Sequence, residues 1–238
     1  MIVDVHSPAT AWETVATTRW GQYTTEVVEE AIRRGADMAA PARSAIEIGC
    51  EGGRWSRLLA SLGWTMTCTD VDPTVLSVCQ QRVPAAKCIL VSPNDPTLPC
   101  ASHTMNLMLC LEVFPVMDST WFLPEASRVL TDDGVLVGVM LNKRSLRGMF
   151  VRVKQSLAPS FEAFYQLSHS EWRRRMNAAG FEIAFERGYC WFPLSRESNS
   201  VLAPYFGQLE RRLGLGRMTA FSPWVIFIAR KRPATNVR

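Results

Sequence analysis

The stretch AIEIGCEGGRWSRLLA, residues 45–60, decides the fold of this 238-residue chain. An apolar run ends in an acid, glycines follow, and a helical pattern begins after them. Glycine lets a backbone turn tightly between a strand and a helix and lets a ligand approach the main chain. A nicotinamide-type GxGxxG would need glycine where Glu51 and Arg54 stand, so that fingerprint is excluded. No GK[ST] follows, which excludes a P-loop.

Outward from this stretch, short apolar runs alternate with helical segments, a pattern typical of a parallel sheet covered on both faces. Strands are predicted over residues 44–49, 65–70, 87–91, 105–111, 135–141, 181–187 and 224–229. Helices are predicted over residues 24–35, 53–62, 73–82, 119–130 and 168–179. We expect Thr24 to cap the first helix and Gly35 to end it, Asp72 to cap the third, and Gly134 to follow the fourth.

The composition fits one globular domain, because 47% of the residues are hydrophobic and 20% are charged. No apolar run reaches the roughly 18–20 residues that cross a bilayer, and no secretion signal opens the chain, so a cytoplasmic location is expected. The seven cysteines contain no CxxC pair, and the three histidines are scattered. A disulfide framework or a zinc cluster is therefore not predicted, and Cys68, Cys88 and Cys110 are interpreted as core thiols.

Residues 45–60 resemble motif I of class I S-adenosylmethionine-dependent methyltransferases, an acid followed by Gly-x-Gly-x-Gly. Glu47, Gly49 and Gly53 match this motif, whereas Glu51 stands at the middle glycine with Gly52 beside it. The resemblance extends over about residues 44–142, because three further segments match in order. Together they imply a pocket for S-adenosylmethionine beyond the carboxyl ends of the strands.

The first of these segments is CTDVDP, where Asp70 ends the second strand. The family places an acid there to hold the two ribose hydroxyls, and a carboxylate accepts two hydrogen bonds from such a diol. In VSPNDPTLP, residues 91–99, either Asn94 or Asp95 would accept from the adenine amino group. In LMLCLEVFPVMD, residues 107–118, Leu111 and Glu112 would line the methionine end, but Pro115 and Val116 replace the family's frequent Glu-His.

The resemblance implies a Rossmann-like, seven-stranded, mostly parallel sheet with helices on both faces, an antiparallel last strand and basic cap insertions. We expect one domain over residues 1–238, with a helical lid (1–43), a cofactor-binding core (44–142) and substrate-side insertions (143–167 and 188–223). The predicted cofactor-binding residues are Tyr23, Glu47, Gly49, Cys50, Glu51, Gly53, Asp70, Val71, Asn94, Asp95, Leu111 and Glu112. No metal site and no oligomeric state are predicted.

Charge is divided unevenly along the chain. Residues 1–141 hold nine basic and 16 acidic side chains, a net −7, whereas residues 142–238 hold 17 basic and six acidic ones, a net +11, which together give the formal +4. The basic and aromatic residues of the insertions suit an anionic acceptor that also has an apolar or ring portion, such as a lipid-linked or nucleotide-linked sugar or a quinone-like compound. They include Arg144, Arg147, Arg152, Lys154, Trp191, Arg196, Arg211 and Arg212.

The predicted activity is methylation of such a small molecule, with oxygen as the nucleophile. The sequence is most similar to the group that includes ubiquinone and menaquinone biosynthesis methyltransferases. A base is then required, and His169 is the first candidate, followed by Tyr165. An RNA methyltransferase and a non-catalytic cofactor-binding protein are the alternatives, although no NPPY-like tetrad, catalytic Cys motif or RNA-binding module is found. No nucleic-acid partner is expected, and residues 149–157 suggest a peripheral membrane contact.

Overall fold

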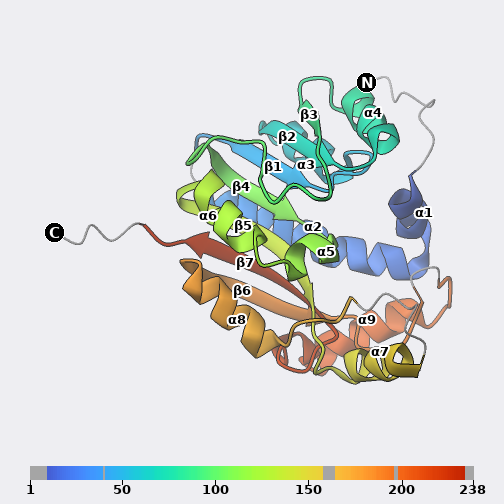
Figure 1. The fold of residues 1–238 in the computed structure, drawn as a ribbon. Helices are drawn as coiled ribbons and strands as arrows, with labels where there is room; N and C mark the ends of the chain where they lie inside the picture. Colours follow the sequence, from blue (N-terminus) through green and yellow to red (C-terminus); the bar gives the residue numbers. More distant parts are fainter. Residues whose placement is uncertain (1–9, 40, 158–163, 196–197, 234–238) are drawn as a thin grey trace.

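The computed structural model describes residues 10–39, 41–157, 164–195 and 198–233. Its centre is a seven-stranded sheet in the order β3-β2-β1-β4-β5-β7-β6 (Figure 1). The ladders from β3 to β5 are parallel, and β7 runs antiparallel to both β5 and β6. The predicted Rossmann-like fold with an antiparallel last strand is confirmed. The strands are β1 (Ser44–Ile48), β2 (Thr65–Asp70), β3 (Lys87–Leu90), β4 (Met105–Cys110), β5 (Leu130–Leu141), β6 (Phe181–Tyr189) and β7 (Trp224–Lys231).

Two apolar cores lie on opposite faces of the sheet, because successive side chains of a strand point to opposite sides. In β4, Leu107 and Leu109 belong to one core, and Met108 and Cys110 belong to the other. The first core also contains buried residues of α2 (Arg19–Met38), α3 (Arg54–Ser61) and α4 (Pro73–Arg82). The second contains residues of α5 (Phe114–Asp118), α6 (Phe122–Val129) and α8 (His169–Ala178).

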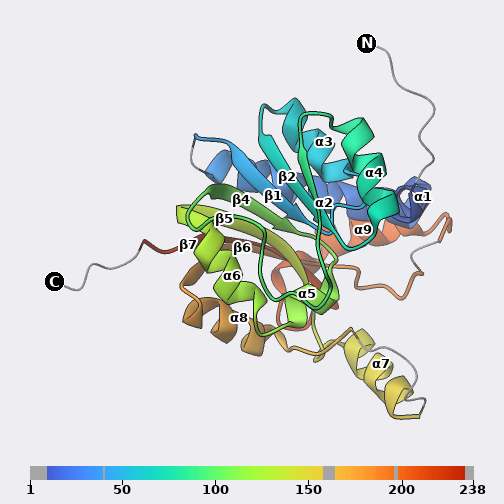
Figure 2. The same cartoon turned by 45° about the horizontal axis from the view of Figure 1, so that its top comes forward.

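Four further elements lie outside these two layers. Helix α1 (Ala11–Thr17) precedes α2, and helix α7 (Leu146–Leu157) follows β5. Helix α9 (Ala203–Arg212) and the short 3-10 helix η1 (Leu215–Arg217) lie between β6 and β7. Figure 2 shows α7 standing away from the body of the domain. No helix in the part of the chain that the structure describes is long and apolar enough to cross a membrane.

Several predicted boundaries are wrong. The first predicted helix begins earlier, since Thr18 caps α2 by accepting a hydrogen bond from Gly21. Gly35 lies inside α2, where an added Cβ would come within 2.5 Å of Val137 Cγ2, so this glycine permits close approach to β5. The helix predicted over residues 119–130 is shorter, since α6 spans Phe122–Val129, and Gly134 lies within β5.

The topology places the ends of three strands at one edge. The chain runs from β1 out to β2 and β3, then returns to β4 on the other side of β1. In open α/β sheets, this reversal leaves a crevice beyond the carboxyl ends of the strands where ligands bind. The loops after β1, β2 and β4 therefore meet at a single position.

Candidate functional site

A cavity of about 660 Å³ lies at this edge, well within the roughly 300–1,000 Å³ of ordinary ligand pockets. The loops after β1, β2 and β4 and the segment after β3 form its walls, and α1 and α2 contribute from the N-terminal side. The lining residues discussed below are Trp12, Thr24, Thr25, Glu47, Gly49, Cys50, Glu51, Asp70, Val71, Asp72, Asp95, Leu111, Glu112, Val113, Phe114, Trp121 and Phe164. Nine of the twelve predicted cofactor residues are among them, and Tyr23, Gly53 and Asn94 are not.

The loop after β1 turns through three left-handed residues. Gly49 has φ of 66°, and an added Cβ would come within 2.5 Å of Val113 Cγ2, so only glycine fits against the loop after β4. Gly53 has φ of 73° and is the N-cap of α3. Glu51 has φ of 48°, which costs a non-glycine residue roughly 1–2 kcal/mol. The loop thus keeps the shape that motif I needs, although a glutamate replaces its middle glycine.

Glu51 connects this loop to two other parts of the site. Its backbone nitrogen donates a hydrogen bond to Asp70 Oδ2 at 2.9 Å. Its carboxylate accepts one from the backbone nitrogen of Trp12, in the first turn of α1, at 3.0 Å. A second link holds α1 in place, since Arg82 of α4 forms a 2.7 Å ion pair with Glu13. The loop after β1, which lines the cavity, therefore holds helix α1 in position beside that cavity.

Asp70 ends β2 with both carboxylate oxygens oriented by the backbone. Besides Glu51, the nitrogen of Asp72 donates to it, at 3.1 Å to Oδ1. A carboxylate oxygen can accept more than one hydrogen bond, so Asp70 retains the capacity to accept from a vicinal diol in the cavity. Asp72 caps α4 instead, through a 2.8 Å bond from the nitrogen of Thr74, as predicted.

Glu47 is buried at the end of β1, with 3% of its surface exposed. Its carboxyl group shares a hydrogen bond with the hydroxyl of Ser56 on α3. Burial raises the pKa of Glu47 to about 8, because a low-dielectric environment disfavours the charged form. Glu47 is therefore largely protonated at neutral pH, and a cationic ligand in the cavity would favour its ionisation.

The structure distinguishes the two candidates after β3. Asp95 lines the cavity and Asn94 does not. The Asp95 carboxylate accepts hydrogen bonds from the nitrogen and the hydroxyl of Thr97, at 3.0 and 2.6 Å, which stabilise the turn. After β4, Leu111 and Glu112 reach the cavity, and Glu112 adopts φ of 62° as the chain turns into α5.

Tyr23 lies between α2 and the insertion that carries α9. Its hydroxyl donates to the carboxylate of Glu210, and it accepts from the nitrogen of Cys190 at 3.3 Å. An added Cβ on Gly207 would approach the Tyr23 ring to 2.8 Å, so α2 and α9 pack closely here. Burial raises the pKa of Tyr23, which keeps the phenol protonated. The structure thus places Tyr23 at a helix interface outside the cavity wall.

The two base candidates also lie outside the cavity wall. His169 is buried in the first turn of α8, and its ring Nε2 is 3.0 Å from Glu186 Oε1. Glu186 also pairs with Arg173 at 2.8 Å. Tyr165 is buried within the first core, while its neighbour Phe164 reaches the cavity. A catalytic role for His169 or Tyr165 stays a prediction that this arrangement does not support.

The basic insertions present several exposed cations. Arg144, Arg152, Lys154, Arg211 and Arg212 are exposed, and Trp191 is half-buried. Arg147 donates to the carbonyl oxygen of Leu194 at 3.4 Å, which connects α7 to the chain after β6. Arg196 lies outside the described residues.

Helix α1 and its cavity residue Trp12 were missed by sequence reasoning, although the sequence holds a signal for them. Thr10 and Glu13 form a capping box, in which the threonine hydroxyl accepts from Glu13 and the glutamate accepts from Thr10. The pattern Thr-x-x-Glu before an apolar run predicts a helix start. Trp121 and Phe164, by contrast, reach the cavity from loops that carry no such signal.

Comparison with known proteins places this geometry in a family. Residues 46–138 match a family described as a methyltransferase domain. The uncharacterized methyltransferase YodH of Bacillus subtilis (strain 168) is 26% identical over 151 residues, which are 60% of this chain and 61% of YodH. The alignment thus spans less than two thirds of that relative.

Solved structures show the same fold. A methyltransferase of Methanosarcina mazei, described as dependent on S-adenosylmethionine, superposes with a TM-score of 0.58 at 14% identity, covering 83% of this chain and 96% of that chain. The [4+2]-cyclase SpnF superposes with a TM-score of 0.61 at 14% identity, covering 95% of this chain and 85% of that one.

The fold, the family match and the cavity define a class I methyltransferase. Residues 46–138 match the methyltransferase domain, and S-adenosylmethionine is the cofactor that this domain and its fold imply. The cavity fits that cofactor, because its volume admits a nucleoside-sized ligand, Gly49 allows close approach to the backbone, and Asp70 offers a diol acceptor.

Proposed function

We propose that this protein transfers the methyl group of S-adenosylmethionine to an oxygen of a small molecule that has an apolar portion and an anionic group. The observation that carries the proposal is the single cavity in which Glu47, Asp70 and the loop after β1 meet aromatic residues from later in the chain. The bound cofactor supplies an electrophilic methyl group. The protein binds and orients both reactants and keeps water away.

An aromatic wall supports an acceptor with an apolar or ring portion. Phe114, Trp121 and Phe164 line the side of the cavity formed after β4 and before α8. The rings of Phe114 and Phe164 lie 5.9 Å apart, and Phe164 is 39% exposed, so it is available to a ligand that enters from solvent. Such rings bury flat apolar surface with little loss of conformational freedom.

Helix α7 supports an acceptor that is linked to a lipid. Leu146, Met149, Phe150, Val153 and Leu157 recur at helical spacing on one face, and each is at least 48% exposed. No acidic residue occurs between Asn142 and Leu157, whereas exposed cations flank this stripe. A projecting helix with an apolar face and basic residues suits the surface of an anionic membrane. A quinone-like or lipid-linked acceptor would be reached from such a surface.

The first experiment is calorimetry with S-adenosylmethionine and with S-adenosylhomocysteine. Binding of both with one site per chain is expected, and absence of binding would contradict the proposal. The second uses a methyl-labelled cofactor and presents lipid extracts in anionic vesicles, water-soluble metabolites, and RNA. Label in the lipid fraction is expected. Label in RNA, with retention on heparin that weakens steeply with salt, would instead support an RNA methyltransferase.

The contribution of α7 is tested separately with Phe150→Ser, and with Tyr205→Ser on α9 as the matched control. Phe150 and Tyr205 are 62% and 65% exposed. Flotation with anionic vesicles is expected to fall for Phe150→Ser and to stay unchanged for the control. Equal flotation of both variants, or no flotation of the unmodified chain, would contradict membrane contact while leaving cofactor binding intact. If the cofactor binds but no label is transferred to any fraction, the chain acts as a non-catalytic binding protein, as the fold alone does not fix activity.

A further inference from the structure

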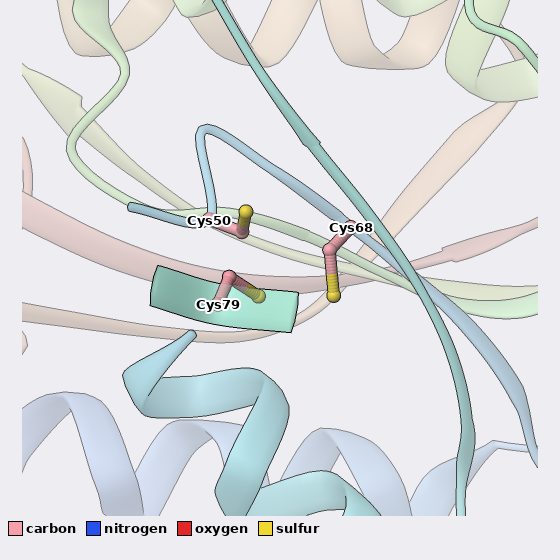
Figure 3. Close-up of side chains that lie close together, drawn as sticks. All are labelled: Cys50, Cys68 and Cys79. Carbon is pink, nitrogen blue, oxygen red and sulfur yellow. The ribbon is translucent and has the colours of Figure 1, made fainter. Parts of the chain in front are cut away.

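Three cysteine thiols converge beside the cofactor cavity. The Sγ atoms of Cys50, Cys68 and Cys79 all lie within 4.8 Å of one another (Figure 3). Cys50 belongs to the loop after β1, Cys68 to β2 and Cys79 to α4. A fourth thiol is adjacent, since Cys88 of β3 pairs with Cys68 in the sheet and its Sγ lies 3.8 Å from that of Cys79.

The prediction of no zinc cluster rests on the absence of a CxxC pair in the sequence. The four cysteines instead come from four successive elements, and the parallel arrangement of β1, β2 and β3 brings them together. Spacing along the chain therefore gives no sign of this cluster, and the proposal below departs from the prediction of no zinc site.

The geometry suits one ion of a thiophilic metal. A divalent zinc-type ion binds thiolate sulfur at about 2.3 Å, so three sulfurs around it lie about 4 Å apart. The three Sγ atoms here lie no more than 4.8 Å from one another, so small side-chain movements would let them hold one ion. Cys68 and Cys79 are fully buried and Cys50 is 2% exposed, so the cluster is dry. Cys50 also lines the cofactor cavity, which gives an ion a route from solvent.

Two neighbours would stabilise the thiolates that form when a metal ion binds. The N-terminus of α3 lies against the cluster, since an added Cβ on its N-cap Gly53 would come within 2.6 Å of Cys79 Sγ. The positive end of a helix dipole stabilises a nearby thiolate. The hydroxyl of Ser56 is 3.0 Å from Cys68 Sγ and can donate to a thiolate there.

We propose that Cys50, Cys68 and Cys79, with Cys88 as the fourth thiol, bind a thiophilic divalent metal ion such as Zn²⁺. Each ligating thiol loses its proton to solvent, and the resulting thiolate donates an electron pair to the ion. Because Cys50 lies in the cofactor loop, an ion fixes that loop, and metal and cofactor then change each other's affinity by the same factor. The inference concerns metal binding alone and does not depend on methyl transfer.

The test uses the reduced, metal-free full chain titrated with Cd²⁺, whose thiolate complexes absorb in the ultraviolet. One Cd²⁺ per chain, thiolate-to-metal absorption and release of about four protons, one from each thiol, are expected. Zn²⁺ should abolish the absorption by competition. A folded chain that shows no thiolate absorption would overturn the proposal.

Variants locate the ion. Cys68→Ala is expected to bind Cd²⁺ at least about 100-fold more weakly, because loss of a ligand exceeds the 10–100-fold cost of losing an outer partner. Cys110→Ala is the matched control, since Cys110 is equally buried but belongs to the core on the other face of the sheet. Circular dichroism checks that each variant folds, and Cys50→Ala in the loop replaces Cys68→Ala if that variant does not. Equal affinity in the cluster and control variants would overturn the assignment.

Discussion

The carboxylate of Glu51 accepts a hydrogen bond at 3.0 Å from the backbone nitrogen of Trp12, which lies 39 residues earlier in the chain. This contact explains why a glutamate stands where motif I usually has glycine. The residue still adopts the left-handed conformation that the loop requires. The Glu51 side chain holds the start of α1 beside the cavity, and the Glu51 backbone nitrogen donates to Asp70.

We therefore expect Glu51→Ala to weaken S-adenosylmethionine binding by about 5–30-fold. The reason is that one hydrogen bond to a charged group contributes on the order of 1–2 kcal/mol, and its loss frees α1. Calorimetry measures the affinity, and hydrogen exchange of α1 measures its release.

Glu51→Gln is the control for this prediction, because the amide oxygen can still accept from Trp12. It should retain most of the affinity and the protection of α1. Equal exchange of α1 in the alanine variant and the unmodified chain would show that the contact does not hold the helix.

Asp70→Ala is expected to cost roughly 1.5–3 kcal/mol of cofactor binding, as for hydrogen bonds to a charged acceptor. The neighbouring Asp72→Ala provides a contrast. Asp72 caps α4 through Thr74, so its loss should lower the free energy of unfolding by about 1 kcal/mol and leave cofactor affinity within about threefold. Calorimetry and denaturant melts separate the two effects. Unchanged affinity in Asp70→Ala would remove this residue from the site.

Glu47 predicts a pH dependence of stability in the cofactor-free protein. Its folded pKa of about 8 is above the value of 4.5 expected in the unfolded chain, so between these values the unfolded state loses a proton that the folded state keeps. Stability should therefore fall by a few kcal/mol as pH rises from about 4.5 to 8 and change little above that.

Glu47→Gln should flatten this part of the profile, and the exposed Glu182→Gln should not. Denaturant melts at several pH values measure it. Binding of the cationic cofactor should also release a proton near pH 7, seen as a buffer-dependent enthalpy. A profile that is equally steep in both variants would contradict the role of Glu47.

Gly53→Ala tests the contact between α3 and the cysteines. Gly53 and Gly180 both have positive φ, at 73° and 85°, so alanine costs roughly 1–2 kcal/mol at either position. At Gly53 the new Cβ would also come within 2.6 Å of Cys79 Sγ, whereas at Gly180 it meets open space. Overpacking adds about 1–3 kcal/mol. Thermal unfolding should therefore show a larger loss for Gly53→Ala, and equal losses would argue against tight packing at the cluster.

The sheet could be predicted from the sequence because each strand is marked by residues that lie next to one another in the chain. The apolar runs of β1, β2 and β4 are short, buried and bounded by acids and glycines, and each was located to within one residue. Helix ends were less predictable, since Thr18 and Thr24 are both plausible caps and only the tertiary structure distinguishes them. Gly35 resembles a terminator but serves the close approach of α2 to Val137.

Site residues were predictable where they lie at the end of a strand. They were not predictable where tertiary packing determines whether a side chain reaches the cavity. Asp70 and Glu112 reach the cavity because Asp70 ends β2 and Glu112 follows β4 at one edge of the sheet. Tyr23 and His169 have side chains that could serve the predicted roles, but they lie outside the cavity wall. There Tyr23 donates to Glu210, and His169 pairs with Glu186. The cysteine cluster depends on contacts among four elements, which no local pattern encodes.

Helix α2 has one side in the cofactor cavity, through Thr24 and Thr25, and presents Tyr23 to Glu210 on the insertion between β6 and β7. A helix is stiff over one turn, so the two sides cannot move independently. Any ligand that rotates α2 from the cavity must also displace the phenol from its carboxylate partner. The hydrogen bond from Tyr23 to Glu210 is thus one of the contacts through which a displacement of α2 at the cavity would reach the insertion.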